Sequence, residues 1–218
     1  MKKQVISMIV IALAVIGIGV GLFFASKGSE PAPVGQQVDG KSLVRDNSHM
    51  TGKKEAKVTM VEFGDYQCPA CAFYDPVIKQ IIDQYKNNPD FNFVFRNFPL
   101  NQLHPNAMIS AEAAEAAAEQ GKFWEMRSLI YEKQKDWAEK PEPLDMFVGY
   151  AQTLGLDTAK FKTAVEQAKF RAVINADEAD GTKIGVDSTP TVFINGEKFT
   201  DKMTAEGFAK KINEQLQK

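Results

Sequence analysis

The longest apolar run of the chain lies at its start. Residues 5–25 are apolar or glycine except for Ser7, and a helix of this length, at ~1.5 Å per residue, crosses a hydrocarbon core of ~30 Å. The run exceeds the ~7–15 apolar residues of a secretory signal peptide, and no convincing cleavage site follows it. We therefore predict an uncleaved signal anchor, one transmembrane helix within residues 1–27. A cleaved signal peptide, which would leave the protein secreted, is the alternative.

The residues on either side of this run set the expected orientation. Lys2 and Lys3 precede it, which places the N-terminus in the cytoplasm by the positive-inside rule. Residues 28–42 are rich in Gly, Pro and Ser without helical or strand periodicity, which is typical of a flexible spacer. We predict a single-pass plasma-membrane protein whose working domain, residues 43–218, lies outside the cytoplasm, at the cell surface or in a periplasm.

The first part of that domain shows a strand, helix, strand pattern. Residues 57–63 are largely apolar on both faces, which predicts a central strand. Residues 69–85 predict a helix, and residues 91–98 an aromatic-rich second strand, parallel to the first. We also expect a short edge strand at Leu43–Arg45. The apolar positions expected to face inward on the helix follow a four-residue spacing: Phe73, Val77, Ile81 and Tyr85.

The middle of the domain is predicted to be helical, over about residues 104–184. Residues 111–120, AEAAEAAAEQ, are read as a solvated helix face, and Asp157 as a helix cap. Residues 191–199 then predict a hairpin, because Asn195-Gly196 suits a type I′ turn, and a final amphipathic helix follows with Phe208 and Ile212 inward. The expected fold class is α/β, one mixed sheet flanked by helices and interrupted by a helical insertion.

The charge balance changes the expected partners. Beyond residue 27 the chain has 23 basic and 28 acidic side chains, so its surface is mildly acidic. A nucleic-acid partner normally requires a basic surface. We therefore expect no nucleic-acid binding.

The two cysteines of the chain, Cys68 and Cys71, are separated by two residues. A structural zinc site needs four ligands, and His49 and His104 show no ligand spacing to the cysteines. A disulfide between them closes a very short loop and so adds little stability. Outside the cytoplasm such a pair can be oxidised. The leading interpretation is a redox-active disulfide, with a structural crosslink as the weaker one, and no metal or soluble cofactor.

The position of the pair assigns a role to each thiol. Cys68 lies where a strand meets a helix that Pro69 opens, and a helix N-terminus favours a thiolate. Cys68 is therefore the expected nucleophile and Cys71 the resolving thiol. Glu62 lies on the predicted central strand, where it is read as a proton acceptor and donor for Cys71 with a pKa raised by burial. The alternative for Glu62 is an exposed strand end.

These residues carry a family resemblance. Glu62-Phe63, the Cys68–Cys71 motif CPAC and the distant GVDSTPTVFING of residues 185–196 resemble membrane-anchored, DsbA-type members of the thioredoxin superfamily. The resemblance implies a thioredoxin fold with a helical insertion, a cis Thr189-Pro190 bond facing the cysteines, and a substrate strand bound at residue 189. Strongly oxidising members often have His at the position of Ala70, so Pro69 and Ala70 are expected to modulate the site.

Three functions remain open from the sequence. The leading one is an extracytoplasmic thiol:disulfide oxidase that donates the Cys68–Cys71 disulfide to reduced secreted proteins through a mixed disulfide; the resemblance implies reoxidation by a quinone-linked membrane oxidase. The second is a reductase or isomerase on the same face of the membrane, which Ala70 permits. The third is a tethered, chaperone-like binding module with a structural disulfide.

Overall fold

The computed structural model describes residues 38–218. The predicted membrane helix, residues 1–27, lies outside these residues, as do residues 28–37 of the predicted spacer. Within residues 38–218, no helix has the length and apolar character needed to cross a membrane.

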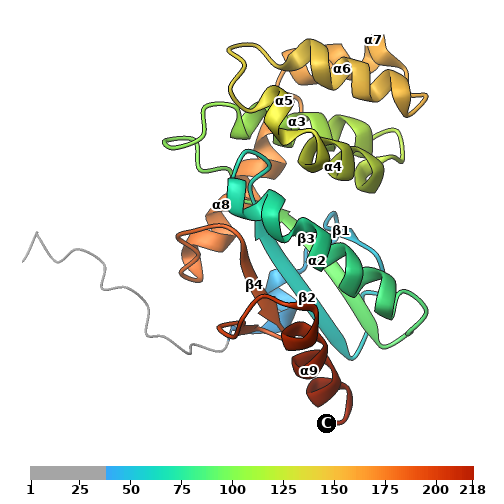
Figure 1. Cartoon of the computed structure of the whole chain (residues 1–218), viewed down its shortest axis with the longest axis vertical. Helices are drawn as coiled ribbons and strands as arrows, with labels where there is room; N and C mark the ends of the chain where they lie inside the picture. The colour runs from blue at the N-terminus through green and yellow to red at the C-terminus, as the bar shows by residue number, and fades with distance from the viewer. Residues whose placement is uncertain (1–37) are drawn as a thin grey trace, which may run out of the picture. The chain divides into compact units, whose positions relative to one another are not determined.

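A mixed sheet forms the centre of residues 38–218 (Figure 1). Its strand order is β1-β3-β2-β4-β5, with β2 and β3 parallel and the other pairs antiparallel. The predicted mixed sheet, with a central strand at 57–63 parallel to the strand at 91–98, is thereby confirmed. The strands are β1 (His49–Met50), β2 (Val58–Gly64), β3 (Phe91–Asn97), β4 (Thr191–Ile194) and β5 (Glu197–Lys198).

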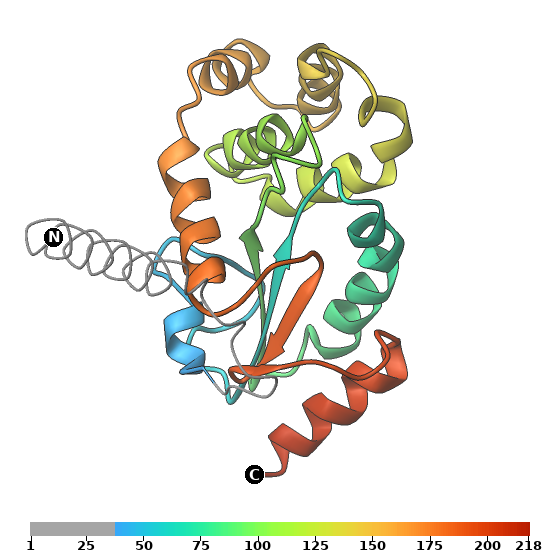
Figure 2. The ribbon, with the colours of Figure 1, turned by 90° about the vertical axis from the view of Figure 1, so that its left-hand side faces the viewer.

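Helices cover both faces of the sheet. In Figure 2, α2 (Pro69–Tyr85) and α9 (Ala205–Leu216) lie on one side of the strands and α8 (Arg171–Lys183) on the other. Because successive side chains of a strand point to opposite faces, Val58 and Met60 of β2 join the core beneath α2 and α9, whereas Val61 joins a second core beneath α8. Both faces of β2 are buried, as its apolar pattern predicts.

The segment between β3 and β4 is helical, and its helices other than α8 gather beyond one end of the sheet (Figure 1). Asp157 caps α7 by accepting a hydrogen bond from the Lys160 N–H, as expected from the sequence. Its helices are α3 (Ala107–Ala118), α4 (Phe123–Glu132), α5 (Gln134–Trp137), α6 (Leu144–Thr153), α7 (Thr158–Glu166) and α8.

The C-terminal elements match their prediction. Asn195 and Gly196 both have positive φ, 49° and 80°, as a type I′ turn between β4 and β5 requires. The Thr204 side chain caps α9 by accepting from the Gly207 N–H. Phe208 and Ile212 of that helix are fully buried.

The edge strand predicted at Leu43–Arg45 is wrong. Leu43 ends a short 3-10 helix, η1 (Gly40–Leu43), and the edge strand is β1 instead. Arg45 is drawn toward α8, where its guanidinium donates to Asp180 Oδ2 (2.7 Å) and the Ala176 carbonyl (3.0 Å). Tertiary contacts therefore overrode the weak strand tendency of this segment.

The inward face predicted for α2 is only partly correct. Ile81 and Tyr85 are buried, but Phe73 is 74% exposed. The helix buries the face that contains Cys71, Asp75 and Ile78. Phe73 follows Cys71 by two residues, so the two side chains point to nearly opposite sides of the helix. Counting only apolar residues missed this face, because two of its positions are a thiol and a carboxylate.

The interpretation of residues 111–120 as a solvated helix face is also wrong. Helix α3 is buried along most of its length, including Glu112 (1% exposed) and Glu115 (5% exposed). Glu115 accepts from the Asn97 amide at 2.7 Å and contacts His49 at 2.9 Å, whereas Glu112 pairs with Arg171 at 3.1 Å. Alanine is small enough to pack on every side of a helix, so this sequence shows little periodicity.

Candidate active site

The two cysteines lie at the start of α2, at the end of the sheet where β2 runs toward the helical segment. Cys68 is the N-cap residue, with extended backbone angles and no capping side chain, and Pro69 occupies the first turn. Pro fits there because the first helical N–H groups have no partner within the helix. The N–H groups of Ala70 and Cys71 are thus left to interact with the Cys68 sulfur.

Cys68 has the properties of a nucleophile. Both cysteines are free thiols in the structure. A hydrogen bond from Cys71 lowers the pKa of Cys68 to about 5, against the opposing effect of burial. The Thr189 side chain and the N–H groups of Cys71 and Ala70 lower this pKa further. Cys68 is therefore a thiolate at neutral pH, which is the reactive form of a thiol.

Cys71 has the opposite properties. Its side chain is fully buried. Burial raises the pKa of Cys71 well above its usual range, and the hydrogen bond to Cys68 and the charge of Glu62 act in the same direction. Cys71 is therefore a protonated thiol when Cys68 is a thiolate. The pKa values of the two thiols thus differ in the direction that the sequence indicates for a nucleophile and a resolving thiol.

The loop before β4 completes the site. The Thr189-Pro190 peptide bond is cis, and the Thr189 carbonyl oxygen lies 3.3 Å from the Cys68 sulfur. The placement implied by the resemblance is thus present, although 121 residues separate Cys68 from Thr189. The buried Thr189 hydroxyl has no other hydrogen-bond partner within residues 38–218. It is positioned as a donor to the Cys68 thiolate.

Glu62 lies beneath the cysteines, on β2, and is 1% exposed. The alternative of an exposed strand end is therefore wrong. Burial raises the pKa of Glu62 to about 7, while the charge of Arg127 opposes this and Asp75 adds to it. A carboxyl with this pKa can both give and accept a proton at neutral pH.

Sequence reasoning missed the partner of Glu62. Arg127 of α4 donates to Glu62 Oε2 at 2.9 Å and to Asp75 Oδ1 at 2.5 Å. Its guanidinium also lies 4.9 Å from the centre of the Phe95 ring. A signal was present, because Arg127 occupies the apolar stripe that Phe123 and Tyr131 form on α4 at four-residue spacing, and a charge on such a stripe indicates a buried partner.

Side chains from the helical segment hold the active-site loop in place. The Gln134 amide of α5 donates to the carbonyls of Tyr66 (2.7 Å) and Cys68 (2.9 Å). His104, in the turn before α3, contacts the buried Asp65 through Nδ1 at 2.6 Å. Buried polar groups need such partners. The helical segment therefore contributes to the geometry of the cysteines through the loop that carries them.

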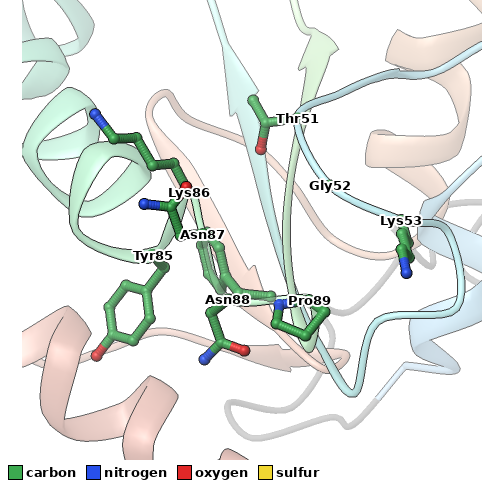
Figure 3. Close-up of a pocket in the computed structure, with 9 residues that line it drawn as sticks. Thr51, Gly52, Lys53, Tyr85, Lys86, Asn87, Asn88 and Pro89 are labelled. Atoms are coloured by element: carbon green, nitrogen blue, oxygen red, sulfur yellow. The ribbon is translucent and has the colours of Figure 1, made fainter.

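A separate hollow of about 250 Å³ lies far from the cysteines. Figure 3 shows it between the end of α2, with Tyr85 and Lys86, and the turn that contains Thr51 and Lys53. Since α2 has 17 residues, its two ends lie ~25 Å apart. The hollow is not part of the thiol site. Within the described chain, no cluster of three His, Cys, Asp or Glu side chains is arranged to hold a metal ion.

Comparisons with known proteins agree with this geometry. The model of the thioredoxin family matches residues 45–214. Among solved structures, oxidised BdbD from Bacillus subtilis has a TM-score of 0.72 at 23% identity. The match covers 85% of this chain and 98% of the BdbD chain. MdbA from Corynebacterium diphtheriae, a thiol-disulfide oxidoreductase, has a TM-score of 0.64 at 22% identity. This match covers 85% of the present chain and 96% of the MdbA chain. The shared fold is that of the DsbA-type proteins.

A transport protein is similar to this chain over part of its length. A Na(+)/H(+) antiporter NhaA 1 from Salinispora arenicola is 38% identical over 154 residues, which are 70% of this chain and 22% of the antiporter. The similarity therefore concerns a segment of the antiporter of about the size of the sheet and its helices.

Proposed function

Since this chain belongs to the thioredoxin family, we propose that it is a thiol:disulfide oxidoreductase of the DsbA type and acts as an oxidase outside the cytoplasm. In this role it donates the Cys68–Cys71 disulfide to pairs of thiols in reduced secreted or envelope proteins. The observation that carries the proposal is the division of the pair into a Cys68 with a pKa of about 5 and a buried Cys71 with a raised pKa.

The reaction proceeds by two exchanges of sulfur atoms. A substrate thiolate attacks the Cys68 sulfur of the oxidised pair, forms a mixed disulfide and expels Cys71 as a thiolate, which takes up a proton. A second substrate thiolate then attacks the substrate sulfur of the mixed disulfide and expels Cys68 as a thiolate. The substrate loses two electrons and gains a disulfide, and the enzyme gains the two electrons as its dithiol.

The low pKa of Cys68 favours this direction. A stabilised thiolate is a good leaving group in the second exchange, and it stabilises the reduced enzyme relative to its disulfide. The enzyme disulfide is then donated readily to a substrate with ordinary thiols. The Thr189 carbonyl borders the Cys68 sulfur and the Thr189-Pro190 bond is cis; we propose that the backbone of residue 189 pairs with an extended substrate segment.

The proposed location rests on the N-terminal sequence. The apolar run within residues 1–27 would attach the enzyme to the plasma membrane, with its working domain outside. The similarity to a segment of an antiporter fits a position near a membrane, and because the matched residues are 22% of that antiporter we propose no transport activity. Reoxidation of the dithiol needs an electron acceptor, for which we propose a quinone-linked membrane oxidase.

The cysteine variants test the mechanism. The oxidised full-length protein, mixed with a reduced model protein that has two cysteines, should form the model protein's disulfide. Cys68→Ser and Cys71→Ser should each abolish this reaction, because neither variant can form the internal disulfide. Mixed with a model protein that already has a disulfide, Cys71→Ser should accumulate mixed disulfides that are visible on non-reducing gels: the Cys68 thiolate attacks the disulfide and expels one substrate thiolate, and no resolving thiol remains. Full oxidase activity in either variant would contradict the assignment, and far-ultraviolet circular dichroism controls for folding.

A reductase would have the same residues but a different reduction potential. Ala70 offers no charge or side-chain donor to the Cys68 thiolate, which favours a less oxidising pair. A potential near the ~-270 mV of thioredoxin, in place of one closer to the ~-120 mV of DsbA, would support the reductase.

A further inference from the structure

The two histidines of the chain each contact a buried carboxyl group, but at different places in the fold. His104 Nδ1 lies 2.6 Å from Asp65 Oδ2, and His49 Nε2 lies 2.9 Å from Glu115 Oε2. The side chains of Asp65 and Glu115 are 0% and 6% exposed. Asp65 belongs to the loop between β2 and α2, which carries Cys68, whereas Glu115 lies on α3. The two pairs are thus alike in chemistry and differ in their relation to the thiol site.

The Asp65 backbone contacts both cysteines. Its carbonyl oxygen accepts a hydrogen bond from the Cys68 N–H at 3.2 Å. Burial raises the pKa of Cys71, and a backbone hydrogen bond from Asp65 partly opposes this effect. A change at Asp65 is therefore felt directly by the segment that holds the two sulfur atoms.

The Asp65 carboxylate joins this loop to the turn after β3. Oδ1 accepts from the Gln67 N–H at 2.8 Å, and Oδ2 accepts from the Leu100 N–H at 2.9 Å. The His104 N–H in turn donates to the Leu100 carbonyl at 2.9 Å, which holds the imidazole over the same oxygen. Both oxygens of Asp65 accept, as a carboxylate does, so the His104 Nδ1 that faces it carries the hydrogen.

A buried carboxylate needs a cation nearby, because an uncompensated charge in the protein interior is strongly destabilising. Within residues 38–218, His104 is the side chain in hydrogen-bonding distance of Asp65 that can become a cation. The His104 side chain is 18% exposed, so its imidazole can exchange protons with solvent. The structure therefore provides a cation for Asp65 at one position only.

The other charged side chains around His104 are more exposed. Asp187, before the cis peptide bond, and Glu178 of α8 line a hollow of about 560 Å³ together with Leu103. On another side, the Lys140 carbonyl accepts from Asn106 at 2.7 Å. The Asp187 and Lys140 side chains are exposed and Glu178 is half-buried, so solvent and salt screen these charges. The charge of Asp65 has no such screening.

We propose that His104 is a positioning residue of the thiol site that acts through Asp65: its imidazolium neutralises the buried carboxylate, so that the Cys68 thiolate forms beside a pair without net charge. The inference rests on the proposed function, because it concerns the same thiolate. Without the imidazolium, the negative charge of Asp65 opposes that of Cys68. Cys68 takes up its negative charge when it leaves the mixed disulfide, so the pair assists the release of oxidised substrate.

The cation is available where Cys68 titrates. An ordinary histidine is positively charged below ~pH 6.5. The hydrogen bond from Cys71 lowers the pKa of Cys68 to about 5. The imidazolium and the thiolate therefore coexist near pH 6, which is the condition for the measurement.

The experiment compares His104→Asn with a matched control, His49→Gln. An asparagine amide can donate from the position of Nδ1 and a glutamine amide from the position of Nε2, so each variant keeps a donor and removes the cation. The rate at which iodoacetamide alkylates Cys68 in the reduced full-length protein, measured against pH, gives the pKa of Cys68. Titration against glutathione at pH 6 gives the reduction potential of the pair.

His104→Asn should disfavour the Cys68 thiolate about fivefold, which is less than the tenfold or more of a charge in direct contact. The pKa of Cys68 should rise by about 0.7. The potential should fall by about 20 mV, since a tenfold change corresponds to ~30 mV for this couple. His49→Gln should match the wild type. An unchanged pKa and potential in His104→Asn, or an equal change in His49→Gln, would overturn the proposal.

A second variant separates the charge of His104 from its support of the loop. Asp65→Asn combined with His104→Asn removes the carboxylate as well as the cation, so the pKa of Cys68 and the potential should return toward their wild-type values. A change that persists in this double variant would show that His104 acts only on the structure of the loop, which contradicts the proposal.

The same measurements separate this inference from the proposed function, because the pKa of Cys68 does not depend on the direction of electron flow. A protein that fails to oxidise a reduced model protein, but whose Cys68 pKa rises in His104→Asn, would lose the oxidase role and keep the role of His104. An active oxidase whose His104→Asn variant behaves as the wild type would keep the first and lose the second.

Discussion

At the scale of single residues, Glu62 shows what a buried carboxyl requires. The carboxyl is 1% exposed, and an unpaired carboxylate in such a place is costly. Arg127 supplies one charge-assisted hydrogen bond, and Asp75 shares that arginine. The result is a carboxyl whose pKa is raised to about 7, because burial outweighs the attraction of Arg127.

This pKa makes stability depend on pH. Glu62 has a pKa of about 7 in the folded protein and an ordinary value of 4.5, so its favourable contribution is complete below pH 4.5 and is lost as the pH rises through 7. We expect the unfolding free energy of the wild type, relative to Glu62→Gln, to fall by about 2 kcal/mol from pH 5 to pH 8. Urea titrations at the two pH values measure the difference.

The exposed Glu214 on α9 provides the control for this titration. Glu214→Gln should leave the difference in stability between pH 5 and pH 8 as it is in the wild type. A constant free-energy difference between the wild type and Glu62→Gln over this range would show that Glu62 has the same pKa in the folded and unfolded chain.

At the scale of elements, the short helix α5 matters more than its length indicates. Its Gln134 makes both side-chain bonds to the carbonyls of Tyr66 and Cys68. These carbonyls belong to the loop that carries the nucleophile from β2 into α2. The helical segment therefore fixes the path of this loop, and with it the position of the Cys68 sulfur at the start of α2.

Removing that amide should weaken the domain. Gln134→Ala leaves the two carbonyls without this donor, so we expect a loss of unfolding free energy of about 1–3 kcal/mol in urea titrations. Gln152→Ala, at an exposed position of α6, is the matched control and should change stability by less than ~0.5 kcal/mol. Equal effects of both variants would mean that Gln134 contributes no more than a surface residue.

At the scale of the whole molecule, the reduction potential of the cysteine pair depends on every group that stabilises the Cys68 thiolate. The start of α2 supplies N–H groups, Cys71 a hydrogen bond and the loop before β4 the Thr189 side chain, while burial opposes them. The pKa of about 5 for Cys68 lies between the ~7 of thioredoxin and the ~3.5 of DsbA. The potential of this protein should be intermediate as well.

Titration of the full-length protein against glutathione should therefore give a value between ~-270 and ~-120 mV. Ala70→His should raise the potential by about 30 mV or more, because an imidazolium would stabilise the Cys68 thiolate. Gln152→His, on exposed α6, controls for the added histidine. An unchanged potential in Ala70→His would show that residue 70 does not modulate the site.

The sequence by itself determined the features that depend on neighbours along the chain. Alternation and apolar runs identify β2 and β3, because the side-chain period of a strand is local. The Asn195-Gly196 turn, the Asp157 cap and the placement of Cys68 ahead of Pro69 also depend on a few adjacent residues. The motif and its position at a helix start therefore point to a thiolate before any contact is known.

The tertiary structure decided what depends on residues far apart. Arg127 meets Glu62 across 65 positions, and Thr189 meets Cys68 across 121. No local period records such a meeting, since it results from the packing of α4 and of the loop before β4 onto the sheet. The sequence also did not reveal that α3 is buried, because alanine packs equally well on every side of a helix and leaves little periodicity. The sequence thus determined where the two cysteines lie along the chain and on the helix. The packing of distant elements determined which charged and hydrogen-bonding side chains surround them.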